Sequence, residues 1–175
     1  MKKLIYLAAG IIFLFSSQAC RDKKGKNYNK TQDDQQSVLF IRNGIESGLT
    51  EIKASGLAIT NSGNQKVIGL AKTMIDDHTR IINKLKQLET DKKMPDADTL
   101  SSVHQQMIAQ LSKLKGPAFD KLYLQMMVNS HQQALKLYTN AENNSDSRIR
   151  KVAANNISAI KMHLDSANAI CVNLQ

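Results

Sequence analysis

Three histidines and one glutamate fall on faces of predicted helices where the neighbouring residues are apolar or small. We name this set, which consists of Glu51, His78, His131 and His163, the polar cluster. Burying such groups without partners costs roughly 1 to 3 kcal/mol each, and more for an ionised carboxylate. They must therefore bond to one another, to water or to an ion. Three imidazoles and a carboxylate suit a transition metal such as Zn, Cu or Fe, whereas Ca and Mg favour more oxygen ligands.

Two explanations of the polar cluster stay open. In one, its members bind a metal ion. In the other, a protonated histidine pairs with Glu51 in a metal-free network, which makes stability depend on pH near neutrality. Met74 and Met127 each precede a cluster histidine by four residues. Thioethers at this spacing favour copper, although methionine on a helix seam more often only fills the core.

Helices are the elements that must bring the polar cluster together. Only 8 Gly, 4 Phe and 4 Tyr are present, too few for a sandwich or barrel of many short strands. Apolar residues instead recur at steps of three and four, with breakers between the runs. This pattern predicts five helices: about Asp33 to Asn61, about Gln65 to Asp91, about Asp98 or Thr99 to Lys115, Pro117 to about Glu142, and from the turn at 143–146 to Leu174.

Each long helix has a predicted core stripe. On the first helix we expect Val38, Ile41, Ile45, Leu49, Ile52 and Ile59 beside a stripe of small residues that includes Glu51. On the second, fourth and fifth helices the stripes carry the three cluster histidines. Tight turns make consecutive helices alternate in direction. At ~1.5 Å per residue, Glu51, His78, His131 and His163 then lie roughly 15, 21, 21 and 17 Å from the same end of the bundle. These depths agree within about one helical turn. His104, on the short third helix, is expected outside the cluster.

The N-terminus resembles a bacterial export signal. Lys2 and Lys3 precede an apolar run from Leu4 to Phe15, which is too short to span a membrane. We expect residues 1–19 to be a signal peptide and Cys20 to be lipidated, with simple secretion as the alternative. Residues 20–34 are then a polar tether on a membrane, for which the outer membrane is favoured. Residues 35–175 form the folded domain.

The net charge of +9 does not indicate a nucleic-acid partner. Five of the basic residues fall in residues 20–30, so the folded part carries only a small excess. Beside a lipid anchor, such a basic segment is explained by attraction to anionic lipid headgroups, or it serves only as a spacer. No protein partner can be named from the sequence.

Several ordered motifs resemble one known family. They are Met74-Ile75-Asp76-Asp77-His78, the Gly116-Pro117-Ala118-Phe119-Asp120 start of the fourth helix, Met127-Val128-x-x-His131 and His163-Leu164, together with Glu51-Ile52 and Leu57-Ala58. These resemble the bacterial envelope family known as domain of unknown function 4142, over about residues 36 to 171. The resemblance implies a ferritin-like up-down four-helix bundle, here with an additional shorter crossover helix, and no established activity.

Most enzyme classes lack support in this sequence. It has no phosphate-binding glycine loop and no Gly-x-Ser-x-Gly motif. Di-iron proteins of this fold place Glu three residues before the ligand histidines, and here those positions hold Ile75, Val128 and Ile160. We therefore expect a non-catalytic, lipid-anchored envelope protein that binds a transition metal. The alternatives are a metal-free scaffold or interaction module and a metal-dependent oxidoreductase.

Overall fold

Five α-helices make up the computed structural model, which describes residues 24–96 and 98–173. They are α1 (Lys24–Asn61), α2 (Gln65–Asp91), α3 (Ser102–Leu111), α4 (Gly116–Ala141) and α5 (Ser147–Val172). No strand occurs in these two ranges. The predicted signal peptide and Cys20 lie outside the described residues. Within the described part, no helix is both long and apolar enough to cross a membrane.

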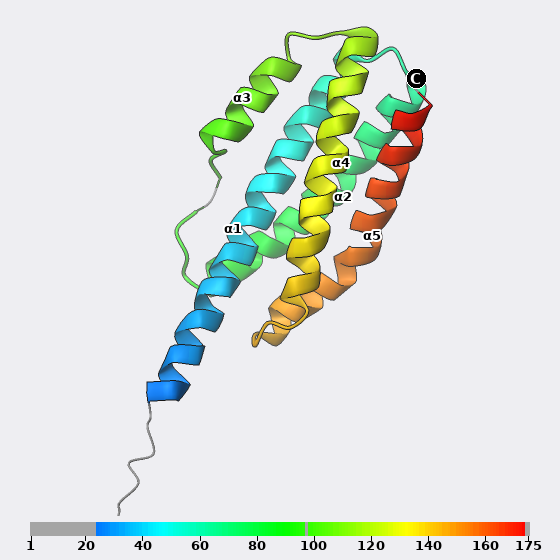
Figure 1. Ribbon diagram of the computed structural model, residues 1–175. Helices are drawn as coiled ribbons and strands as arrows, with labels where there is room; N and C mark the ends of the chain where they lie inside the picture. Colours follow the sequence, from blue (N-terminus) through cyan, green and yellow to red (C-terminus); the bar gives the residue numbers. More distant parts are fainter. Residues whose placement is uncertain (1–23, 97, 174–175) are drawn as a thin grey trace, which may run out of the picture.

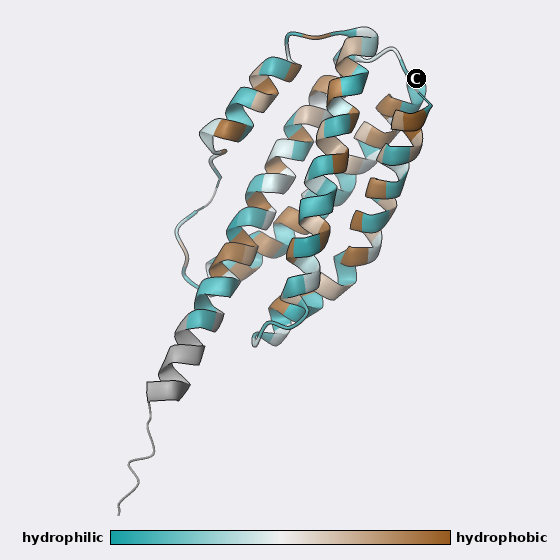
Figure 2. Cartoon of the chain, viewed as in Figure 1, coloured by the Kyte–Doolittle hydropathy of each residue, from teal (hydrophilic) through white to brown (hydrophobic). Residues whose placement is uncertain are grey.

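The four long helices form an up-down bundle, as the sequence predicted (Figure 1). Around the bundle the order is α1, α2, α5, α4, so α1 lies diagonally across from α5, and α2 across from α4. Every neighbouring pair is antiparallel. The short α3 packs outside this bundle, against α1 and α4. Apolar residues face the interior of the bundle and hydrophilic residues face outward (Figure 2).

Local signals define most helix ends. The side chain of Asn64 accepts a hydrogen bond from Lys66 N at 2.9 Å and caps α2, as predicted. Pro117 occupies the first turn of α4. Gly116 has φ +58°, a left-handed conformation that favours glycine where the chain turns into α4. The third helix is shorter than expected, because Ser101 caps its start and a turn follows Leu111.

The first helix differs from its prediction in length. It begins at Lys24 instead of near Asp33, so residues 24–34, expected as a polar tether, are helical. Apolar periodicity signals only the packed part of a helix, and these first turns extend beyond the other helices (Figure 1).

The packed face of α1 also differs from its prediction. Ile41 and Ile45 are buried as expected, but Ile59 is exposed. The small-residue stripe faces the core instead, because it allows α2 to approach closely. A Cβ atom at Gly44 would lie 2.7 Å from Leu85 Cδ1, and one at Gly48 would lie 2.9 Å from Ile82 Cγ1. This close approach brings the backbone of α1, and with it Glu51, to the bundle interior.

Candidate metal centre

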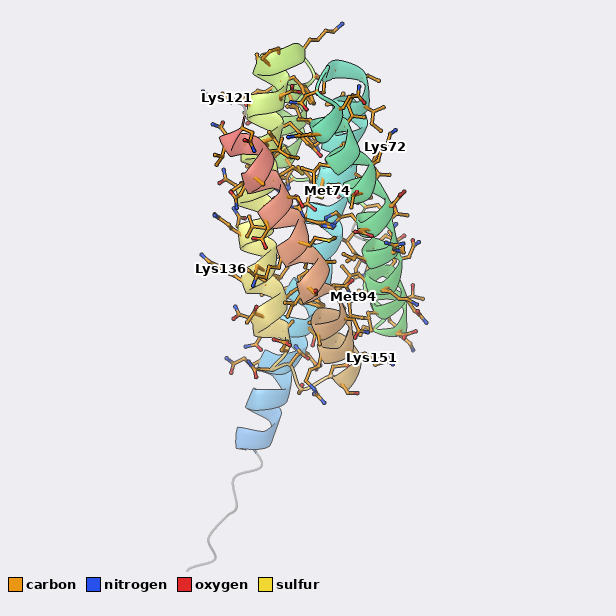
Figure 3. The ribbon with its side chains drawn as sticks, turned by 90° about the vertical axis from the view of Figure 1, so that its right-hand side faces the viewer. Lys72, Met74, Met94, Lys121, Lys136 and Lys151 are labelled. Carbon is orange, nitrogen blue, oxygen red and sulfur yellow. The ribbon has the colours of Figure 1, made fainter. Side chains whose placement is uncertain are left out.

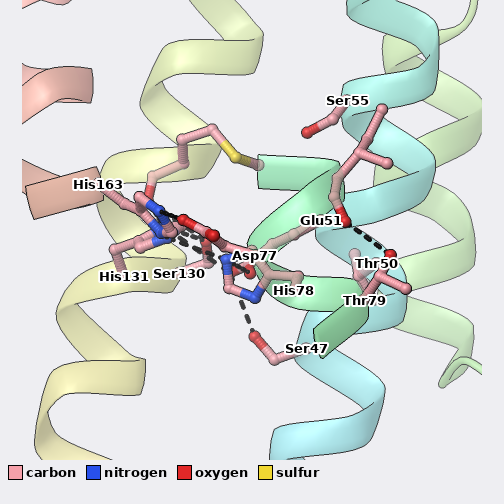
Figure 4. A network of polar contacts seen from close by, with 12 residues as sticks. Ser47, Thr50, Glu51, Ser55, Asp77, His78, Thr79, Ser130, His131 and His163 are labelled. Atoms are coloured by element: carbon pink, nitrogen blue, oxygen red, sulfur yellow. Dashed lines mark hydrogen bonds and ion pairs between the residues drawn. The ribbon is translucent and has the colours of Figure 1, made fainter. Parts of the chain in front are cut away.

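The bundle brings all four members of the polar cluster together at one level of its interior (Figure 4). Glu51 comes from α1, His78 from α2, His131 from α4 and His163 from α5. At most 5% of any of these residues is exposed. Each bundle helix therefore contributes one side chain to the cluster from its buried face.

Three imidazole nitrogens converge at the centre of the cluster. His78 Nε2 and His131 Nε2 are 3.3 Å apart, and His131 Nε2 and His163 Nδ1 are also 3.3 Å apart. One ring nitrogen from each histidine lies within 4.8 Å of the other two. Glu51 Oε2 lies 2.9 Å from His78 Nε2, and Ser47 Oγ donates to Glu51 Oε1 at 3.3 Å. The carboxylate thus adjoins the triad through His78.

The other ring nitrogens of two histidines bond to acceptors outside the triad. His131 Nδ1 donates to the backbone carbonyl oxygen of Met127, one turn earlier on α4, at 2.9 Å. His163 Nε2 donates to Asp77 Oδ2 on α2 at 2.8 Å. Asp77 in turn pairs with Arg80. Ligand histidines in metal proteins usually donate their second N–H to a carboxylate or a backbone carbonyl in this way.

Burial and neighbouring charges decide which groups are ionised. Burial raises the pKa of Glu51, but attraction to His78 and His131 and hydrogen bonds outweigh it and lower the pKa to about 2. Burial lowers the pKa of His78, but the Glu51 charge reverses this and the pKa is raised. Burial lowers the pKa of His131 and of His163, and repulsion from other histidines adds to the effect. The metal-free cluster therefore consists of a Glu51–His78 ion pair beside two neutral imidazoles.

These bonds leave two lone pairs facing each other. A neutral imidazole carries one N–H, and His131 and His163 both direct theirs to acceptors outside the triad. His131 Nε2 and His163 Nδ1 are then both acceptors, although they are only 3.3 Å apart. Two acceptors at this distance repel each other unless a proton or a metal ion lies between them. The proton of His78 Nε2 can serve one of them only by leaving Glu51, and the triad could instead hold a metal ion.

The spacing of the donor atoms also fits one ion. Two nitrogens bound to the same ion at about 2.0 to 2.1 Å, with tetrahedral angles, are roughly 3.3 Å apart. Both measured nitrogen pairs have this separation, 3.3 Å. The third pair lies within 4.8 Å, so three neutral imidazoles could bind one transition metal ion once this pair draws together, and the Glu51 carboxylate would supply negative charge beside it.

Asp77 was missed by the sequence analysis. The sequence pattern did not distinguish it from other acidic residues on a helix surface, yet it holds His163 from the neighbouring helix. The available signal was its position: a residue directly before His78 points about 100° away from it around the helix, toward the adjoining helix. Which helix adjoins α2 on that side is decided by the bundle order, which the sequence did not supply.

Other polar or sulfur-bearing candidates have different surroundings. His104 lies apart from the cluster, as predicted, and its Nδ1 contacts Glu46 Oε1 at 2.7 Å. Met74 and Met127 are fully buried in the apolar cluster around Tyr123, which agrees with a packing role. Tyr123 Oη bonds to Ser55 Oγ at 2.9 Å.

Comparison with protein families gives one match. Residues 22–170 match the family described as "Domain of unknown function (DUF4142)". A comparison with curated proteins finds no match.

Solved structures share the fold. A DUF305 fragment from Deinococcus radiodurans has a TM-score of 0.70 at 14% identity and covers 79% of this chain and 96% of its own. CopM in the Cu(II)-bound form has a TM-score of 0.67 at 20% identity and covers 78% and 95%. A DUF305 protein from Streptomyces coelicolor, provisionally named as secreted, has a TM-score of 0.68 at 11% identity and covers 79% and 93%. At these identities the likeness concerns the fold alone.

Proposed function

We propose that this chain, which belongs to the DUF4142 family, binds a transition metal ion and that copper is the favoured ion. The family has no assigned activity, so the function is inferred from the site. The proposed ligands are His78, His131 and His163, with Glu51 as the fourth donor or as the charge partner. The observation that carries the proposal is that His131 Nε2 and His163 Nδ1 face each other at 3.3 Å while the other nitrogen of each ring bonds to an acceptor outside the triad.

The choice of copper has two supports. Imidazole is a good ligand for Cu, Zn, Fe and Ni, and affinity at such sites is highest for Cu(II) among the divalent ions of this row. In addition, one protein of the same fold has been described in a Cu(II)-bound form. Zn and Fe remain the competing ions of the proposal, and the triad would bind them through the same nitrogens.

Titration of the metal-stripped chain with Cu(II) tests the proposal. The chain has 4 Tyr and no Trp, so quenching of tyrosine fluorescence reports an ion near the buried Tyr123 and Tyr138. We expect one Cu(II) per chain and an electron paramagnetic resonance spectrum with nitrogen couplings. Zn(II) and Fe(II) are measured in parallel by elemental analysis after dialysis.

Two substitutions make the titration specific. His131→Ala removes the central imidazole of the triad, and we expect the affinity to fall at least about 100-fold, since even partners of ligands contribute 10- to 100-fold. His104→Ala is the matched control, because this histidine lies outside the cluster and bonds to Glu46. Circular dichroism checks that both variants fold. Failure of the wild-type chain to retain any of the three ions would favour the metal-free network.

We further propose that the bundle works in the bacterial cell envelope, anchored to a membrane by lipid on Cys20. The support is the export signal in residues 1–19 and the position of Cys20 directly after it. Mass spectrometry of the N-terminus of the mature protein tests the anchor. An acylated cysteine at position 20 is expected, and an unmodified Cys20 would show simple secretion instead.

A further inference from the structure

The buried metal site needs a path to solvent, and the carboxylate of Asp77 is the charged group of the network that is partly exposed. The side chains of the polar cluster are between 0% and 6% exposed, whereas that of Asp77 is 16% exposed. On the α1 side, Gly48 packs against Ile82 without a gap. On the α4 side, His131 and Met127 are fully buried. Within the described residues, the network reaches the surface through a charged group at Asp77, where α2 and α5 meet, whereas its half-buried members on α1 and α4, Ser47 and Ser130, are uncharged.

Two open grooves flank this contact between α2 and α5. One is lined by Thr73, Met162 and Ser166 and has His163 on its wall. The other is lined by Arg80, Lys84 and Val152, farther along the same pair of helices. Figure 3 views this face of the molecule, with Lys72 toward one end and Lys151 toward the other. The bond between Asp77 and His163 connects α2 and α5 between the two grooves.

Arg80 lies beside the one carboxylate of the network that solvent reaches. It pairs with Asp77 across one turn of α2, and 75% of its side chain is exposed. Asp77 thus has two partners: His163 toward the interior and Arg80 toward solvent. A divalent cation that approaches Asp77 meets the positive charge of Arg80 first, and the two charges repel each other.

We infer that the metal ion enters between α2 and α5 by way of Asp77, and that Arg80 limits the rate of its uptake. This inference depends on the proposed metal binding. Asp77 attracts the ion and holds His163 in the orientation that receives it, while Arg80 competes for the same carboxylate. Arg80 is a positioning and gating residue, because it acts through its ion pair with Asp77, which is not a proposed ligand.

The rate of Cu(II) uptake, followed by stopped-flow quenching of tyrosine fluorescence, tests the inference. Arg80→Gln removes a like charge within several ångströms of the path, so we expect uptake about fivefold faster at low ionic strength. The difference should shrink in high salt, because the side chain is exposed. Asp77→Asn should slow uptake at least about tenfold and weaken its salt dependence.

Arg148→Gln is the matched control. Arg148 lines the same face but lies 15 residues before His163 on α5, about 22 Å away along the helix. We expect its uptake rate to equal that of the wild type. An Arg80→Gln chain that loads at the wild-type rate, or an equal acceleration in both arginine variants, would overturn the inference. Absence of quenching in the wild-type chain would instead contradict the proposed function itself.

Discussion

Replacing Glu51 by Gln removes the buried negative charge of the cluster while it keeps the size of the side chain. Glu51 is 1% exposed, and its Oε2 lies 2.9 Å from His78 Nε2. Its pKa falls from 4.5 to about 2 in the folded chain. At 1.36 kcal/mol per pKa unit, a shift of this size corresponds to about 3 kcal/mol of folding free energy. Losing one partner of a buried ion pair has a comparable cost, about 3 to 5 kcal/mol.

The pH range of this contribution follows from the two pKa shifts. The pKa of Glu51 is lowered, so its contribution is present above pH 4.5 and is lost as the pH falls toward 2. The pKa of His78 is raised, so its contribution is present below 6.5 and is lost as the pH rises through the folded value. The ion pair therefore contributes most between about pH 4.5 and 6.5.

Urea unfolding of the metal-free chain at pH 6, followed by circular dichroism in the presence of a chelator, measures the effect. We expect Glu51→Gln to lower the free energy of unfolding by about 3 kcal/mol. Glu46→Gln is the matched control on the same helix, since Glu46 also contacts a histidine, His104, but is 26% exposed. Its loss should stay below about 1 kcal/mol. Equal losses in the two variants would refute the assignment of a buried Glu51–His78 ion pair.

Three further outcomes can be measured on the same protein. Gly48→Ala should lower stability by about 1 to 3 kcal/mol in urea unfolding, because the added Cβ would lie 2.9 Å from Ile82 Cγ1. Gly56→Ala, with nothing within 4 Å of its Cβ, should instead raise stability by about 0.5 to 1 kcal/mol; a loss in both would contradict the close approach of α1 and α2. Cu(II) affinity should increase from pH 6 to pH 8, with at least one proton released per ion, because the pKa of His78 is raised and this histidine must lose its proton to bind. An affinity that is independent of pH over this range would exclude His78 as a ligand.

The resemblance to a known family and the helical periodicity predicted much of this molecule. Residues of the predicted stripes on α2 and α4 that include His78 and His131 are buried, and α2 has the predicted bounds. The common level of the four cluster residues also follows from the sequence, because each helix residue adds a fixed rise and short turns set the starting points. Apolar periodicity did not predict that α1 begins at Lys24, because packing is absent in its first turns. It also did not predict the packed face of α1, where glycines lie against α2.

The sequence by itself determined that each of four helices carries one member of the polar cluster on a predicted core face, at similar depth. Only the tertiary structure decided how these residues face one another. The order of helices around the bundle places α5 beside α2, so that Asp77 reaches His163 and fixes the nitrogen that carries its proton. Periodicity along a helix says which face is buried but not which helix covers it. That choice depends on the fit between side chains of different helices, here on the glycines that let α1 and α2 approach, and it sets both the chemistry of the cluster and its path to solvent.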